Sequence, residues 1–125
     1  MKVRCVSEQP TAQQALLLGR YFHAGRQVFP VARDREYTVF GLLFLGGQAW
    51  VELATEFEQL VSAPLLLFEV VDPQIPSVWA IRTGDDRVAL LPEALHNPDY
   101  YQALAEGDSK ALAQFRALRA QLERD

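Results

Sequence analysis

The sequence is short of the residues that most often carry chemistry, with one cysteine and two histidines among 125 residues. Cys5 has no partner for an internal disulfide, and because it alternates with Met1 and Val3 we interpret its thiol as a small buried apolar side chain rather than a nucleophile. His23 and His96 lie far apart in the sequence and outside the spacings typical of metal ligands. The sequence therefore predicts no metal site and no cofactor.

Enzyme motifs are also missing. None of the four serines follows the Gly-flanked pattern that presents a hydrolase nucleophile to a histidine base. The Gly46-Gly47 pair is not followed by a helix and a lysine, as a phosphate-binding loop would require. We therefore predict no catalytic residues and favour a protein that is not an enzyme.

Long hydrophobic runs are absent as well. The longest charge-free run, Tyr37–Val51, contains three glycines and is too short to span a bilayer. The segment Met1–Val6 is followed by Ser7-Glu8-Gln9-Pro10 and not by an apolar stretch with a small-residue cleavage site, so no signal peptide is predicted. Together with the single cysteine, these features predict a cytoplasmic protein that does not contact the membrane.

What remains is the composition of an ordinary globular domain, with 50% hydrophobic and 22% charged residues. A chain of this length can bury roughly two thirds of the surface that its unfolded form exposes. Because no linker separates its segments, we predict a single domain over residues 1–125.

Charge is segregated along the chain. Residues 1–35 contain six basic and two acidic side chains, whereas residues 36–99 contain ten acidic and two basic ones. Either the two parts pack together and neutralise each other, or the acidic part attracts a basic protein partner. An acidic central segment argues against nucleic acid, which requires Lys and Arg on the contacting surface.

The first half of the chain predicts strands around one helix. In chain order we expect a short strand at Met1–Val6, a helix at Thr11–Phe22 that ends by Gly25, and a hairpin formed by Tyr37–Leu45 and Gln48–Thr55. Thr11 and Gln14 have the spacing of a capping box, and Gly46-Gly47 suits a two-residue turn. Both faces of Tyr37–Leu45 are apolar, so this strand is expected to lie in the interior, covered by the helix or by a second copy of the protein.

The second half continues with strands and ends in helices. We interpret residues 56–62 as a loop or helical turn, and predict strands at Leu65–Val71, Val78–Thr83 and Val88–Leu91. Asn97 and Pro98 begin a helix that stops at Gly107, and Asp108 caps a second one with an apolar stripe. The fold class is therefore α+β. A twisted antiparallel sheet of about five strands can close into an SH3-like, partly open barrel, and a plain sheet with helices on one face is the alternative.

Several acidic and aromatic residues stand out as candidate site residues. Glu69 interrupts an apolar strand, where burial would raise its affinity for a proton, as a general acid requires. Two carboxylates beside tryptophans could suit a sugar, with Glu52 near Trp50 as the second carboxylate. The structural alternative places Glu69 on the solvated side of the sheet or beside an arginine such as Arg82, with the tryptophans in the core.

Tyr100 and Tyr101 form a second candidate feature, since they follow Asn97 and Asp99 and predict an exposed aromatic and acidic patch. Tyrosine is favoured at protein interfaces because its ring is apolar and its hydroxyl forms hydrogen bonds. Packing of the C-terminal helix on the sheet explains one of the two tyrosines equally well.

Three segments, Glu36–Gly41, Leu67–Asp72 and Asn97–Tyr101, together resemble a group of small uncharacterised bacterial cytosolic proteins of the polymorphic-toxin immunity type. The resemblance covers roughly residues 30–122 and implies a binding role without catalytic residues. The basic N-terminal third has no counterpart in it.

Our leading hypothesis is a non-enzymatic protein-binding module, an immunity protein that neutralises a basic toxin through an acidic surface. The residues predicted to bind the partner are acidic or aromatic: Trp50, Glu52, Glu56, Glu58, Glu69, Asp72, Asp85, Asp86, Tyr100 and Tyr101. The first alternative is a small enzyme or ligand-binding domain that uses Glu52 and Glu69 in a pocket. The second is a structural homodimer formed through the strand with two apolar faces.

Overall fold

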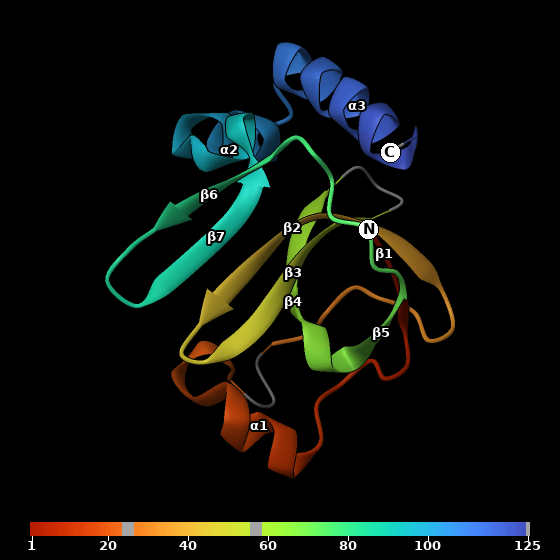
Figure 1. The fold of residues 1–125 in the computed structure, drawn as a ribbon, viewed down its shortest axis with the longest axis vertical. Coiled ribbons are helices and arrows are strands. Elements are labelled where there is room, and N and C mark those ends of the chain that lie inside the picture. Colours follow the sequence, from red (N-terminus) through yellow and green to blue (C-terminus); the bar gives the residue numbers. More distant parts are fainter. Residues whose placement is uncertain (24–26, 56–58, 125) are drawn as a thin grey trace.

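The computed structural model describes residues 1–23, 27–55 and 59–124 (Figure 1). Within these residues the chain forms an open antiparallel sheet of seven strands and three α-helices. The strands are β1 (Lys2–Cys5), β2 (Glu36–Leu45), β3 (Gln48–Ala54), β4 (Leu60–Pro64), β5 (Phe68–Asp72), β6 (Trp79–Thr83) and β7 (Arg87–Pro92), and the helices are α1 (Ala12–Leu18), α2 (Pro98–Ala105) and α3 (Ser109–Arg124). The predicted α+β class and the antiparallel sheet are confirmed.

The ten-residue strand β2 organises the sheet. Its beginning pairs with β1, its second half pairs with β3, and its last four residues also pair with β7. The register with β3 shifts between Val39 and Gly41, which is a β-bulge. A Cβ at Gly41 would lie 2.1 Å from Leu91 Cδ2 and 2.6 Å from the Leu90 carbonyl oxygen, so only glycine lets β7 come this close.

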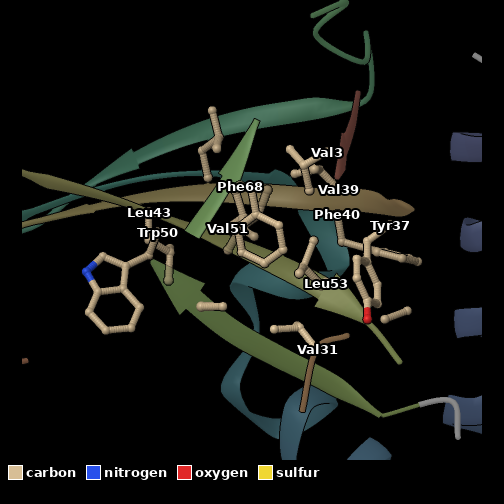
Figure 2. Close-up of a cluster of buried hydrophobic side chains, with 14 of the residues drawn as sticks. Val3, Val31, Tyr37, Val39, Phe40, Leu43, Trp50, Val51, Leu53 and Phe68 are labelled. Atoms are coloured by element: carbon tan, nitrogen blue, oxygen red, sulfur yellow. The ribbon is translucent and has the colours of Figure 1, made fainter. Parts of the chain in front are cut away.

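Both faces of β2 are buried, as its apolar sequence predicts. Val39 and Phe40 are fully buried neighbours on this strand, and Figure 2 shows them within the cluster that also includes Val3 and Phe68. The Phe40 ring stacks on Phe115 of α3, with ring centroids 5.0 Å apart. The C-terminal helix therefore covers Phe40, whereas the cover predicted for this strand was the N-terminal helix or a second copy of the protein.

Two expectations about the strands are wrong. The sheet has seven strands and not about five, partly because residues 60–62, which were predicted to belong to a loop or helical turn, form β4 beside β3 together with residues 63 and 64. Leu65–Val71 is not one strand, because Leu65–Leu67 forms a 3₁₀ helix before β5 begins. An SH3-like barrel is not confirmed, since the sheet is open and each of β4, β5 and β6 pairs with one described strand only.

The N-terminal helix begins as predicted and ends earlier. The Gln14 backbone N–H donates to Thr11 Oγ1 (3.1 Å) and the Thr11 N–H donates to Gln14 Oε1 (2.9 Å), so the capping box is confirmed. The helix ends at Leu18 because Gly19 has a φ of 57°, which leads into a 3₁₀ helix at Gly19–Tyr21. The predicted end at Gly25 lies outside the described residues.

The C-terminal helical pair is confirmed. Asn97 Oδ1 accepts a hydrogen bond from the Asp99 N–H (2.9 Å) at the start of α2, and Asp108 Oδ2 accepts one from the Ala111 N–H (2.9 Å) at the start of α3. Figure 1 shows α2 and α3 together at one end of the molecule and α1 at the other. No helix in the described ranges is long and apolar enough to cross a membrane.

Candidate functional site: a groove around Glu52

Glu52 is the one charged side chain that is buried among the residues that the structure describes, with 3% of its surface exposed. It lies on β3 between two small neighbours, Gly41 of β2 and Ser62 of β4. Because paired residues in a sheet project on the same side, the small Ser62 leaves room beside the carboxyl group, whereas the space over Gly41 is filled by Leu91 of β7. The groove described below occupies this side of the sheet.

Two neutral groups hold the carboxyl in place. The Ser62 hydroxyl donates to Glu52 Oε1 across the β3–β4 pair, and the Tyr101 hydroxyl of α2 donates to Oε2 at 3.2 Å. The second bond connects the sheet to the helix that lies over it. Within the described residues no cation lies in ion-pair contact with Glu52, so its charge is offset only by hydrogen bonds and by the more distant Arg87.

Burial dominates the acid–base behaviour of this cluster. It raises the pKa of the Glu52 carboxyl, and the hydrogen bonds from Ser62 and Tyr101 and the charge of Arg87 oppose this effect to a smaller extent. Burial and the neighbouring carboxylate also raise the pKa of the Tyr101 phenol. Tyr101 is therefore a hydrogen-bond donor, and Glu52 takes up a proton more readily than an ordinary glutamate.

The carboxyl lines a hollow of about 460 Å³ between the sheet and the segment 93–101. The 3₁₀ helix Glu93–His96 and α2 supply its outer wall. The lining residues come from six elements, namely β2, β3, β4, β7, the 3₁₀ helix and α2: Leu43, Glu52, Leu60, Ser62, Arg87, Leu91, Leu95, His96, Pro98 and Tyr101. The hollow combines leucine side chains with convergent polar groups, which is a common feature of ligand sites.

Two further hollows adjoin it and extend it into a groove. One, of about 290 Å³, shares Leu60 and Tyr101 with it and is otherwise lined mainly by aliphatic side chains of β4 and α2. The other, of about 310 Å³, shares Arg87 and His96 with it and also contains Arg82. The groove thus has an aliphatic end, a central carboxyl group and a cationic end, and this surface is called the Glu52 groove below.

His96 is fixed within the Glu52 groove. Its Nε2 lies 2.8 Å from the Ala80 carbonyl oxygen, and since that oxygen can only accept, Nε2 carries the proton. No group of three or more His, Cys, Asp or Glu residues in the described ranges is arranged to hold a metal ion.

Glu69, the other predicted carboxylate, lies elsewhere. It is on β5 with 47% of its side chain exposed, and it forms an ion pair with Arg4 rather than with Arg82. Arg82 pairs with Glu93. Glu69 does not line any of the three hollows that form the Glu52 groove, so the expectation of one pocket shared by Glu52 and Glu69 is wrong. The solvated alternative for Glu69 is confirmed.

The acidic site residues that the structure describes do not all lie on one surface. Glu52 is buried, while Asp72 ends β5 and Asp85 and Asp86 lie between β6 and β7, at separate places in Figure 1. Glu56 and Glu58 lie outside the described residues. The prediction that Glu52 belongs to an acidic surface is therefore wrong.

The segregated charges partly neutralise each other. Arg20 pairs with Asp86 at 2.5 Å, and the Tyr21 hydroxyl donates to the same carboxylate at 2.6 Å. The hydrogen bond from Tyr21, followed by that from Arg20, lowers the pKa of Asp86. The Arg4–Glu69 pair likewise joins the basic N-terminal part to the acidic part. Packing of the two parts against each other is thus confirmed.

The predicted aromatic site residues belong mainly to the interior. Trp50 is 3% exposed and meets Phe29 edge to face, with ring centroids 6.2 Å apart. Tyr100 and Tyr101 are half-buried, and the Tyr100 hydroxyl donates to the Ala111 carbonyl at 3.3 Å. The expected exposed patch at these tyrosines is wrong, because one packs on α3 and the other points to Glu52.

Sequence reasoning missed Ser62, Arg87 and His96 as parts of the site. Ser62 was assigned to a loop, and the three residues meet only through the pairing of β3 with β4 and the return of the chain over the sheet. A comparison with known protein families, with curated proteins and with solved structures found no match.

Proposed function

We propose that this protein binds a small polar ligand in the Glu52 groove. The observation that carries the proposal is the Glu52 carboxyl, which is buried beside a hollow and is held by two neutral donors with no contacting cation among the described residues. A buried carboxylate without a paired charge is costly to maintain. A ligand that supplies further hydrogen bonds or a positive charge would offset that cost.

The proposal is tested by titrating the ¹⁵N-labelled protein with a panel of amino acids, organic acids, amines and nucleosides and following amide chemical shifts. We expect shifts that saturate at β3, β4 and α2. Glu52→Gln should weaken the binding, and Glu69→Gln, a matched substitution outside the groove, should leave it unchanged. If no compound in the panel shifts these amides, the proposal is contradicted.

A second candidate is the protein-binding role that the resemblance implies, and the exposed edge at β5 favours it. β5 pairs only with β1 among the described strands, and it exposes Val70 (45%) and Val71 (38%), with Ile75 (59%) close behind. An edge strand with exposed apolar side chains is a template for pairing with another chain. Glu69 is paired with Arg4, so Asp72 at the end of β5 is the neighbouring carboxylate that would favour a basic partner.

In this second proposal the protein is a cytoplasmic immunity protein of bacterial origin, and a second copy of the chain is the competing occupant of the edge. Calorimetry with a basic toxin domain encoded by a neighbouring gene tests the first, with Val70→Lys expected to weaken binding. Light scattering tests whether a second copy of the chain occupies the edge. Unchanged toxin binding by Val70→Lys would contradict a role for β5.

A further inference from the structure

The three parts of the Glu52 groove differ in chemistry, and their order specifies a ligand. The aliphatic hollow and the cationic hollow adjoin different parts of the hollow that contains Glu52, since each shares a different pair of residues with it. A ligand that matches all three parts needs an apolar group, a hydrogen-bond donor and an anionic group. We infer that the ligand is an α-amino acid with an apolar side chain, an inference that rests on the proposed function.

The central part of the groove calls for a cationic donor. Each Glu52 oxygen accepts one hydrogen bond from a neutral hydroxyl, of Ser62 or Tyr101, and retains capacity for another. An ammonium group offers three N–H donors together with the positive charge that the site lacks. An anionic group placed here would be repelled, and a purely apolar group would leave the carboxyl uncompensated.

The cationic part offers Arg87 for a carboxylate. Arg82 is engaged by Glu93, and His96 donates to the Ala80 carbonyl. Arg87 lines both this hollow and the Glu52 hollow, and it has no ion-pair partner among the described residues. Its guanidinium is therefore available to bind a carboxylate through two parallel hydrogen bonds.

The aliphatic part accommodates the side chain. Leu60, Val61, Leu104 and Ala105 supply the aliphatic side chains around a hollow of about 290 Å³, which Gln59 and Tyr101 also line. Burial of a leucine or phenylalanine side chain there would remove apolar surface from water, which favours binding against the costs of association. An α-amino acid carries its ammonium, carboxylate and side chain on one carbon, which matches three adjoining subsites.

The test uses L-leucine and L-phenylalanine as probes, with analogues that each lack one group. For leucine these are 4-methylpentanoate, which has no ammonium, and 3-methylbutan-1-amine, which has no carboxylate. Isothermal calorimetry or amide shifts should show each analogue binding at least about tenfold more weakly than the amino acid, because a buried polar group is then left unpaired.

Two variants assign the subsites. Glu52→Gln should weaken the binding of L-leucine at least about tenfold, because the ligand ammonium loses its carboxylate partner. The binding of 4-methylpentanoate, which has no ammonium, should be unaffected. Arg87→Gln should weaken the binding of L-leucine and leave the binding of 3-methylbutan-1-amine unchanged. Arg87 is exposed, so its replacement does not threaten the fold. Arg4→Gln, far from the groove, is the matched control and should change neither affinity.

The outcomes separate the inference from the proposed function. If L-leucine, L-phenylalanine and their deaminated analogues bind equally, or if the groove binds other compounds of the panel and no amino acid, the inference is overturned and the ligand-binding function stands. If neither the amino acids nor any compound of the panel perturbs the groove, both are overturned.

Discussion

Glu52 and Glu69 are the same residue type in two short strands rich in apolar residues, yet their environments are opposite. Glu52 is 3% exposed, whereas 47% of the Glu69 side chain is exposed. β3 lies between β2 and β4 with α2 above it, while β5 pairs only with β1 among the described strands. The position of the strand within the sheet, and not the local sequence, determines which carboxyl group is buried.

The two carboxylates also differ in how their charge is balanced. Glu69 has Arg4 beside it, at the surface, where an ion pair contributes little to stability. Glu52 is held by hydroxyl groups of Ser62 and Tyr101. The buried site therefore depends on neutral donors that the strand pairing and α2 must position, and the exposed site does not.

The largest expected effect comes from removing the cover of the buried region. Phe115→Ala deletes the ring that stacks on Phe40 at 5.0 Å, and the loss of a fully buried phenylalanine costs about 3–5 kcal/mol of stability. Urea denaturation measures it. Gln114→Ala, at an exposed position of the same helix, is the control and should stay within about 0.5 kcal/mol.

A loss below about 1 kcal/mol for Phe115→Ala would mean that α3 does not hold the core together in the way described.

A smaller effect is expected from Ser62→Ala. This change removes the donor to Glu52 Oε1. Because Ser62 itself is exposed, water can replace the donor in part, and the cost should be that of one hydrogen bond, about 0.5–1.5 kcal/mol. The free energy of unfolding from urea denaturation at neutral pH measures it. Ser77→Ala, at an exposed serine, serves as the control, and equal stability losses in the two variants would contradict the assigned role of Ser62.

The pH dependence of stability should distinguish the two regions further. Because the pKa of Glu52 is raised in the folded state, folded protein binds the proton more tightly than unfolded protein does. The resulting stabilisation is present below about pH 4, where an unfolded glutamate is protonated, and is lost as the pH rises through the raised pKa.

Relative to Glu52→Gln, the wild-type free energy of unfolding should therefore fall as the pH increases over this window, and urea denaturation at a series of pH values measures it. A difference that is constant or rises with pH would contradict the burial of an ionisable Glu52.

The smallest effect is expected for Glu69→Gln. Both side chains of its ion pair with Arg4 are exposed, so the loss in free energy of unfolding should lie within the error of denaturation measurements. The free energies of unfolding of the wild type and the variant are compared at low and high salt, since any contribution of the ion pair should vanish at high salt. A loss comparable to that of Ser62→Ala would mean that the edge strand β5 is not solvated as described.

Much of the fold follows from local sequence signals. The capping box of Thr11 and Gln14, the Asn97-Pro98 helix start and the apolar stripe of α3 all act within a few residues, and the structure confirms each of them. The β4 strand was missed because its sequence has little β-branched or alternating character. Its pairing with β3 is a long-range effect that local propensity does not report.

The candidate site was predictable only in part. Glu52 stood out as a carboxylate near an aromatic residue, but the hypothesis of a buried carboxyl group was raised for Glu69, beside the solvated alternative that the structure shows. Which glutamate lies in the interior depends on the small neighbours Gly41 and Ser62 and on Tyr101 from α2. These contacts arise from strand register and from the return of the C-terminal chain, neither of which a sequence pattern reports.

The most direct test is the pKa of Glu52, measured by following glutamate side-chain carboxyl ¹³C shifts against pH and assigning the resonance with Glu52→Gln. A carboxyl that is buried with only neutral donors in contact should titrate clearly above the ordinary glutamate value of about 4.3. A midpoint at or below that value would show that Glu52 is solvated or paired with a cation, and it would contradict the Glu52 groove as described.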